Sequence, residues 1–302
     1  MPPGAEKAPA LASREELTKR TIPHMLLSNG SSTSSTAPPT TSAKSAEARF
    51  SVKGTAIVTG GTGTLGLAAA TALLQHGLQG LMLFDVNIDP ARKKLNNLRA
   101  EFPDAKIEAL SVDVTDEIAV QQAVEETAQL LGSVDILLCY AGVVGCVNAL
   151  DMPASQWRKI LEINTTGSFI CAQAAARQMV KQGSGGSIIF TASISAHRVN
   201  YPQPQAAYNV SKAALLSLKS CLAAEWARYG IRTNTISPGY MDTILNEGDG
   251  LAETRKVWSD RNPMGRMGVP SELTGAVVLL ASSAGTYING ADIVVDGGAI
   301  VF

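Results

Sequence analysis

Tyr208 and Lys212 have the side chains and the spacing for acid–base chemistry. They stand four residues apart in Tyr208-Asn209-Val210-Ser211-Lys212, near the start of a segment whose apolar residues recur with a helical period. In a helix this spacing places the phenol and the ammonium on one face, one turn apart. A nearby ammonium stabilises a phenolate and should lower the pKa of Tyr208 from about 10 toward neutrality. The pair is therefore predicted to exchange a proton with a carbonyl or alcohol oxygen.

A hydroxyl group that could bind the same oxygen lies upstream. The stretch IIFTASIS covers residues 188–195, and Ser193 stands just beyond its apolar, strand-like part. We expect Ser193 to hydrogen-bond the substrate oxygen.

A glycine-rich turn supplies a second kind of chemistry. Gly61-Thr62-Gly63-Thr64-Leu65-Gly66 fits G-x-G-x-x-G between an apolar run, 55–58, and a helix-like stretch that begins at Leu67. In that context the glycines allow a tight turn and a close approach of pyrophosphate, which the N–H groups of the helix N-terminus can bind. The residues of this turn predicted to contact a dinucleotide are Gly60, Thr62, Gly63, Thr64, Leu65 and Gly66.

Asp85 indicates which dinucleotide this turn would bind. It ends the second apolar run, about twenty residues after the glycines, where a carboxylate accepts hydrogen bonds from the adenosine ribose hydroxyls. A carboxylate there would repel a 2′-phosphate, and Val86-Asn87-Ile88 brings no Arg or Lys. The sequence therefore favours NAD over NADP, with a simple loop cap as the other interpretation of Asp85.

The elements that position these residues alternate between short apolar runs and longer segments of helical period. The predicted strands are 56–59, 81–84, 107–112, 136–139, 187–191, 233–236 and 293–295. The predicted helices are 66–76, 90–101, 116–131, 155–182, 207–229 and 270–282. This order predicts an α/β fold with a doubly wound, Rossmann-type parallel sheet and helices on both faces, in which ligands bind beyond the carboxyl ends of the strands.

Composition limits the other possibilities. The chain has 302 residues, 45% of them hydrophobic, and a formal net charge of −1, which gives no electrostatic case for a nucleic acid or membrane partner. No apolar run reaches the roughly 18 residues of a membrane span. Neither the four cysteines nor the three histidines have the spacing of metal ligands, so no metal site is expected. A reducing compartment, the cytoplasm, is the expected location.

The first 50 residues differ from the rest. Residues 29–46 are nearly all small or polar, and such a segment buries too little apolar surface to offset its ordering entropy. We expect residues 1–50 to be a flexible extension rich in Ser, Thr and Pro, and residues 51–302 to be one NAD(P)-binding domain. The extension either has no specific role or is an arm that touches a neighbouring subunit through residues 22–27.

From about residue 52 onward the chain resembles a short-chain dehydrogenase/reductase. The resemblance implies that Tyr208 is the proton donor or acceptor, that Lys212 also binds the nicotinamide ribose, that Ser193 orients the substrate oxygen, and that Asn164 holds a water molecule in a proton relay. It also implies a homotetramer or homodimer paired through the segments 155–182 and 207–229, although their apolar faces could equally be core. The further residues that it assigns to the cofactor are Asp113, Val114, Tyr140, Ala141, Gly142, Pro238, Gly239, Met241 and Thr243.

Two departures from the family pattern stand out. Members of the classical branch usually read TGxxxGxG, whereas here Thr64 takes the central position and the glycine comes one place earlier, at Gly63. Tyr140 replaces the asparagine of the usual NNAG, which leaves the geometry beside the adenosine ribose open.

Substrate choice is expected to reside in the loops after Gly142, Ser193 and Gly239. Residues 240–265 resemble a lid: Leu245-Asn246-Glu247-Gly248-Asp249-Gly250 carries glycine hinges and polar groups, and Val257-Trp258 could close over a ligand. His197 could line the pocket or be a solvated loop residue. Residues 262–298 and the extension resemble fungal polyol dehydrogenases and ketose reductases, so a sugar alcohol or ketose is favoured. The alternatives are a ketone reductase of secondary metabolism, a 3-oxoacyl reductase, and a non-catalytic NAD-binding scaffold.

Overall fold

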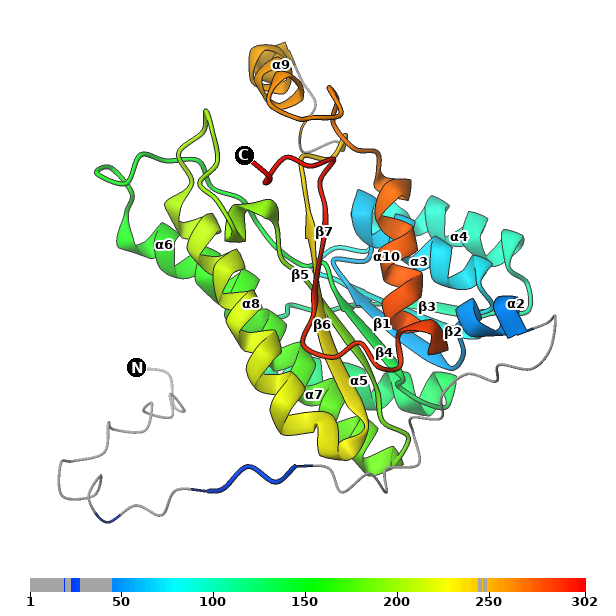
Figure 1. The fold of residues 1–302 in the computed structure, drawn as a ribbon. Helices are drawn as coiled ribbons and strands as arrows, with labels where there is room; N and C mark the ends of the chain where they lie inside the picture. Colours follow the sequence, from blue (N-terminus) through cyan, green and yellow to red (C-terminus); the bar gives the residue numbers. More distant parts are fainter. Residues whose placement is uncertain (1–18, 20–22, 28–44, 244–245, 247–248) are drawn as a thin grey trace, which may run out of the picture.

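Seven parallel strands form the centre of the molecule. The computed structural model describes residue 19 and residues 23–27, 45–243, 246 and 249–302. The strands lie in the order β3-β2-β1-β4-β5-β6-β7 (Figure 1). After β3 the chain crosses back over the sheet to form β4 beside β1, so the strand order reverses between β1 and β4. The doubly wound sheet predicted from the sequence is confirmed. The strands are β1 (Thr55–Thr59), β2 (Gly80–Asp85), β3 (Lys106–Ser111), β4 (Ile136–Cys139), β5 (Gly186–Thr191), β6 (Ile231–Pro238) and β7 (Asp292–Val295).

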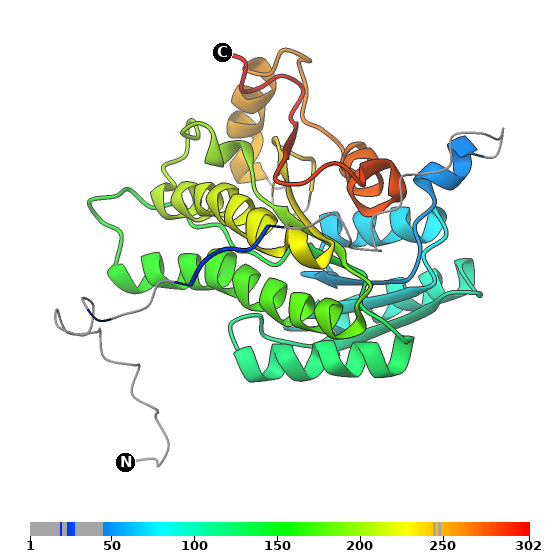
Figure 2. The ribbon, with the colours of Figure 1, turned by 60° about the horizontal axis from the view of Figure 1, so that its bottom comes forward.

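Helices cover both faces of this sheet. One layer contains α3 (Thr64–Gln75), α4 (Arg92–Glu101) and α10 (Thr274–Ala281), and the other contains α5 (Glu117–Leu131), α7 (Gly167–Gln182) and α8 (Ala206–Trp226). Figure 2 shows α7 and α8, in green and yellow, on the opposite side of the sheet from α10, in red. Each layer buries its own hydrophobic cluster against the strands.

The strands alternate between these two clusters. In β1, Ala56 and Val58 face the α3 and α10 layer, whereas Ile57 faces the α5 and α7 layer. Because both faces are covered, all five residues of β1 are buried, which explains the continuous apolar runs of the sequence.

The helices depart from the prediction in several places. The predicted helix 155–182 consists of α6 (Ala154–Leu161), a π-helical turn η2 (Glu162–Thr166) and α7. The predicted helix 270–282 begins as a 3₁₀ turn, η7 (Pro270–Leu273), before α10. An unpredicted helix, α9 (Ala252–Asp260), stands beyond the carboxyl ends of the strands in Figure 1.

The extension lies mostly outside the described residues, as do Leu245, Glu247 and Gly248 of the predicted hinge. Its last part forms α2 (Ser45–Phe50), where the carbonyl of Arg49 accepts a hydrogen bond of 2.9 Å from Ser283 Oγ. Among the described residues, no helix is long and apolar enough to cross a membrane, and no three His, Cys, Asp or Glu side chains gather as a metal site would require.

Candidate active site

Tyr208 and Lys212 lie in the first two turns of α8, at the carboxyl edge of the sheet. Lys212 Nζ lies 5.7 Å from the centroid of the Tyr208 ring and donates a hydrogen bond of 2.7 Å to the carbonyl oxygen of Thr191, the last residue of β5. Lys212 is only 6% exposed. The helical spacing read from the sequence therefore places phenol and ammonium side by side, and the bond to Thr191 fixes α8 against β5.

Burial changes the pKa values of both groups. It lowers the pKa of Lys212 to about 8, and the nearby Cys139 thiol acts in the opposite direction. Burial also raises the pKa of Tyr208; a hydrogen bond with Ser193 lowers it, and Tyr240 raises it further. The net direction is upward because loss of water around the phenol is the largest effect, and the lowering of the Tyr208 pKa by Lys212 stays a prediction.

Ser193 stands beside Tyr208, and its contact with the substrate oxygen stays a prediction. It precedes the 3₁₀ turn η3 (Ile194–Ala196); its Oγ accepts a hydrogen bond of 3.1 Å from the backbone N–H of Ser195 and donates one of 3.0 Å to Ser195 Oγ. These bonds fix the hydroxyl where β5 ends, and its hydrogen bond with Tyr208 places the two oxygens on one side of the sheet edge.

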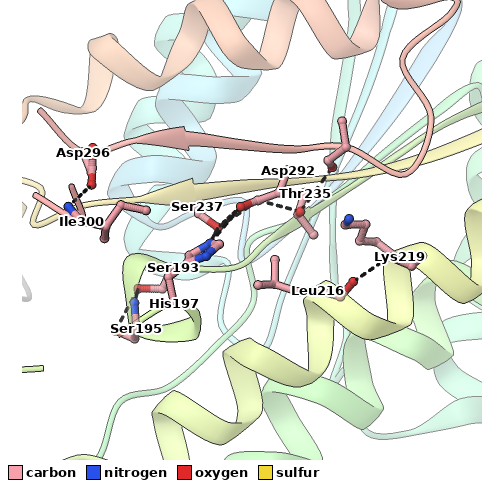
Figure 3. Close-up of polar contacts among 12 residues, drawn as sticks. Ser193, Ser195, His197, Leu216, Lys219, Thr235, Ser237, Asp292, Asp296 and Ile300 are labelled. Carbon is pink, nitrogen blue, oxygen red and sulfur yellow. Dashed lines mark hydrogen bonds and ion pairs between the residues drawn. The ribbon is translucent and has the colours of Figure 1, made fainter. Parts of the chain in front are cut away.

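His197 directly follows the same turn, and its partly exposed imidazole lies against β6 and β7. Its Nε2 lies 2.9 Å from Asp292 Oδ2 and 3.2 Å from Ser237 Oγ (Figure 3). Asp292 Oδ1 also accepts hydrogen bonds from Thr235 Oγ1, at 2.7 Å, and Ser237 Oγ, at 2.9 Å. The imidazole therefore holds the Ser193 loop against the neighbouring strands. That His197 also lines the substrate pocket stays a prediction.

Asn164 lies in the π-helical turn between α6 and α7 and is completely buried. Its Oδ1 accepts the backbone N–H of Val143 at 2.8 Å, and its Nδ2 donates to the Val143 carbonyl at 2.9 Å and to Ser211 Oγ at 3.0 Å. The side-chain amide thus joins the loop after β4 to the residue that precedes Lys212. The water-holding role implied by the family resemblance stays a prediction.

The glycine-rich turn lies between β1 and α3, as predicted. Gly60 has φ +61°, and a Cβ atom there would lie 2.7 Å from the backbone nitrogen of Ala141; a Cβ at Gly66 would lie 2.5 Å from the Gly60 carbonyl oxygen. Gly63 is the N-cap of α3 and places no side-chain cap on its first N–H groups. Thr64 and Leu65 form the first turn of this helix, so the turn leaves open the amide cradle that a pyrophosphate requires.

Asp85 closes this turn from the end of β2. Its Oδ2 accepts hydrogen bonds from Thr62 Oγ1, at 2.6 Å, and from the Thr62 backbone N–H, at 3.2 Å. The carboxylate is thus partly engaged in holding the glycine turn.

The ends of β3 and β4 carry the next predicted cofactor residues. Asp113 Oδ1 accepts the backbone N–H and the hydroxyl of Thr115, which lowers its pKa, so the carboxylate at least caps the strand end. Val114 is buried, and its side chain fills the space beside Gly167 at the start of α7.

Tyr140, which stands where the family pattern has an asparagine, is held by its backbone and by its phenol. Its backbone N–H donates to the Thr59 carbonyl at 3.0 Å, and burial raises the pKa of its phenol, which is hydrogen-bonded to Thr191. Ala141 N–H donates to Thr59 Oγ1 at 3.2 Å, and a Cβ at Gly142 would lie 3.7 Å from Lys212 Nζ. The loop after β4 therefore contacts the end of β1, where the glycine turn begins, through Ala141 and lies beside Lys212 at Gly142.

The residues predicted after β6 continue this edge. Pro238 ends the strand, and Gly239 N–H donates to the Val295 carbonyl at 3.0 Å. Met241 and Thr243 are both buried, so the loop is packed down onto the domain. All predicted site residues thus lie along one edge of the sheet.

The sequence interpretation missed a polar and aromatic cluster above this edge. Tyr240 stacks on Trp258 of α9, with ring centroids 4.2 Å apart and an interplanar angle of 8°. The Tyr240 hydroxyl accepts hydrogen bonds from Asn200 Nδ2, at 2.8 Å, and Gln203 Nε2, at 3.1 Å. Trp258 was predicted to close over a ligand; Asn200 and Gln203 carried no signal beyond their place in the loop after Ser193.

The fold and these side chains together define a class of protein. A doubly wound sheet with an open glycine turn, and a Tyr–Lys pair beside a serine at the same edge, is built for dinucleotide-dependent alcohol or ketone chemistry.

Comparison with known proteins gives the family. Residues 61–299 match the family model described as enoyl-(acyl carrier protein) reductase. The chain is 40% identical over 253 residues to a probable NADP-dependent mannitol dehydrogenase of Yarrowia lipolytica (83% of this chain, 89% of the relative). It is also 40% identical over 253 residues to a sorbose reductase of Candida albicans (82% and 88%). A crystal structure of an NADPH-dependent 3-quinuclidinone reductase from Rhodotorula rubra matches with a TM-score of 0.79 and 35% identity (88% and 98%). The chain belongs to the short-chain dehydrogenase/reductase family and is an oxidoreductase acting on alcohols or ketones.

These relatives correct the prediction of NAD. The Yarrowia relative is named as NADP-dependent and the Rhodotorula structure as NADPH-dependent, which contradicts the preference read from Asp85. The prediction assumed that the Asp85 carboxylate is free to bind the adenosine ribose hydroxyls and that it would repel the 2′-phosphate of NADP. In the structure the Oδ2 of that carboxylate is bound by Thr62, so the residue type alone was a poor guide to the dinucleotide.

Proposed function

We propose that the protein transfers a hydride between NADP(H) and a sugar-derived secondary alcohol or ketone, interconverting a polyol and a ketose. The observation that carries the proposal is the cluster of Tyr208, Lys212 and Ser193 at the sheet edge, beside the glycine turn. The names of the mannitol and sorbose relatives support the substrate class.

The residues present fit a dinucleotide. The Cβ clashes at Gly60 and Gly66 show that the turn packs backbone against backbone, and the first turn of α3 carries no side-chain cap on its N–H groups. These residues would hold the pyrophosphate, and Gly142 leaves space in front of Lys212 for the nicotinamide ribose. When bound, the dinucleotide supplies the hydride or accepts it.

The chain's own groups handle the proton. Because burial keeps the pKa of Tyr208 high, the phenol is protonated at neutral pH and donates its proton to the carbonyl oxygen of a ketone. Ser193 orients that oxygen, and Lys212, with a pKa of about 8, is mostly cationic at neutral pH and stabilises the phenolate that forms. Asn164 positions the Lys212 segment through Ser211.

A cyclic ketone is the second candidate substrate. The 3-quinuclidinone reductase, whose name gives a cyclic ketone, shares 35% identity and covers 98% of its own chain in the match. A non-catalytic scaffold is disfavoured because Lys212 and Ser193 both contact Tyr208, and Asn164 binds Ser211, the residue before Lys212.

The assembly and location remain part of the proposal. Exposed apolar side chains on α7, Phe169 and Val180, and on α8, Val210, support pairing of these helices between subunits in a homotetramer or homodimer. Cytoplasmic location is supported by the four cysteines, which are all free thiols.

The test is a substrate panel. Purified protein with NADP⁺ and, separately, mannitol, sorbitol, arabinitol or a cyclic secondary alcohol is followed at the absorbance of NADPH. The proposal expects reduction of NADP⁺ with at least one polyol. Turnover of the cyclic alcohol alone would show that the substrate is a cyclic alcohol or ketone, the second candidate, and not a polyol. Tyr208→Phe should abolish turnover while NADPH still binds, measured by fluorescence titration, and Tyr229→Phe at an exposed tyrosine is the matched control.

A further inference from the structure

The cluster above the catalytic edge has fixed hydrogen-bond directions. The indole N–H of Trp258 can only donate, and it lies 3.2 Å from Gln203 Oε1. The other end of that amide, Nε2, must therefore donate to Tyr240 Oη, 3.1 Å away. Trp258 thus sets the orientation of Gln203, and Gln203 occupies one lone pair of the Tyr240 hydroxyl.

One donor and one acceptor of the cluster, the Tyr240 hydroxyl hydrogen and Asn200 Oδ1, lack a partner among the described residues. Asn200 Nδ2 donates to Tyr240 Oη, so both lone pairs of that oxygen are used and its hydrogen has no acceptor within the described part of the chain. Asn200 Oδ1 is buried and has no hydrogen-bond partner among the residues that the structure describes. Turning the Asn200 amide over would satisfy the Tyr240 hydrogen but leave the amide N–H groups unpaired, so either orientation leaves a buried polar group free. Buried polar groups without partners are rare, and each needs an explanation.

The position of these groups points to the reacting centre. Asn200, Tyr240 and Trp258 line one small pocket. Asn209, the neighbour of Tyr208 in α8, donates a hydrogen bond of 3.2 Å to the carbonyl oxygen of Arg198, which also lines this pocket, so the pocket lies beside the start of α8 that carries the proton donor. A single hydroxyl could donate to Asn200 Oδ1 and accept from the Tyr240 O–H, which is the pairing that an alcohol offers and a hydrocarbon does not.

We propose that Asn200 and Tyr240 form a binding subsite for a non-reacting hydroxyl of the substrate, with Trp258 and Gln203 holding Tyr240, and Tyr240 holding Asn200, in place. This inference rests on the proposed function and deepens it, because it names the residues that select hydroxylated ketones over plain ones. A site built to hydrogen-bond a hydroxyl discriminates strongly against analogues that lack it.

The experiment compares two substrates in three variants. Asn200→Leu and Tyr240→Phe are assayed with NADPH, fructose as the hydroxylated ketone and cyclohexanone as the plain ketone; Tyr287→Phe, at a fully exposed tyrosine, is the control. We expect kcat/KM for fructose to fall at least tenfold in both variants, mainly through KM, and that for cyclohexanone to change less than twofold. Tyr240→Phe keeps the ring that stacks on Trp258, and thermal melts and the KM for NADPH report whether either variant is merely misfolded.

The outcomes separate this inference from the proposed function. An equal fall with both substrates would show that the cluster only supports the fold, and no fall with either would show that no substrate hydroxyl binds there; each overturns the subsite and leaves the proposed function standing. If the unmodified protein reduces cyclohexanone but no ketose, the polyol assignment fails and the subsite fails with it.

Discussion

Lys212 Nζ donates a hydrogen bond of 2.7 Å to the carbonyl oxygen of Thr191. Thr191 ends β5, and two residues later the chain places Ser193 beside Tyr208. One bond therefore sets the start of α8 against the strand that delivers the serine, so the three groups of the proposed proton transfer share a single anchor.

Replacing Lys212 with methionine should change how stability depends on pH. The unfolded lysine has a pKa near 10.4 and the folded one about 8, so between these values the unfolded chain binds more protons and the stability of the wild type rises with pH. From pH 7 to pH 9.5 this contribution amounts to about 2 kcal/mol. Urea denaturation of both proteins at the two pH values should show the wild type gaining about that much relative to Lys212→Met. A constant difference between the two proteins would contradict the buried-ammonium interpretation.

Replacing Thr62 with valine should weaken cofactor binding without changing the charge of the site. The substitution removes the 2.6 Å hydrogen bond to Asp85 and leaves the backbone bond at 3.2 Å to hold the turn. A hydrogen bond to a charged group contributes about 1.5–3 kcal/mol, so the KM for NADPH should rise about tenfold or more. Thr71→Val, on the same helix layer but away from the turn, is the control; an unchanged KM in Thr62→Val would show that Asp85 does not brace the turn.

The carboxylate of Asp292 should matter more to stability than the imidazole that it binds. In Asp292→Ala the hydroxyls of Thr235 and Ser237, both fully buried, lose their carboxylate acceptor, and we expect a loss of about 2–3 kcal/mol in the free energy of unfolding. In His197→Ala those bonds remain, and the pair is partly open to water, with side-chain exposures of 27% and 14%, so the loss should be about 1 kcal/mol or less. Denaturant titration measures both, and the reverse order would refute the network of Figure 3.

Local patterns predicted the framework well because the sheet obeys them strictly. The strands β1, β2, β4, β5 and β6 are buried on both faces, so their apolar runs are visible in the sequence. The glycine turn and the Tyr208–Lys212 spacing follow from backbone geometry alone. The match of Ile136–Cys139 to β4 residue for residue is an example.

What the sequence did not show depends on partners distant in the chain. The π-helical turn at Asn164 interrupts a segment with unbroken helical period, because Val143 and Ser211 bind its amide from two other elements. The Tyr240–Trp258 stack joins the loop after β6 to α9, and the pKa of Tyr208 depends on burial that only the packed structure creates. The dinucleotide preference failed for the same reason, since Asp85 is held by Thr62.

Two glycines of the turn should respond differently to alanine. Gly60 has φ +61°, and its added Cβ would meet the Ala141 backbone nitrogen at 2.7 Å, so Gly60→Ala combines backbone strain with a clash that no side chain can relieve. We expect it to lower the free energy of unfolding by about 2 kcal/mol or more. Gly63 has φ −70°, and its Cβ would approach only the Gly60 carbonyl, at 3.2 Å, so Gly63→Ala should cost about 1 kcal/mol or less. Urea denaturation of both variants without cofactor measures the difference. Equal losses would mean that the turn relaxes freely around residue 60, and the close contact between the turn and the loop after β4 would then have no part in shaping the pyrophosphate cradle.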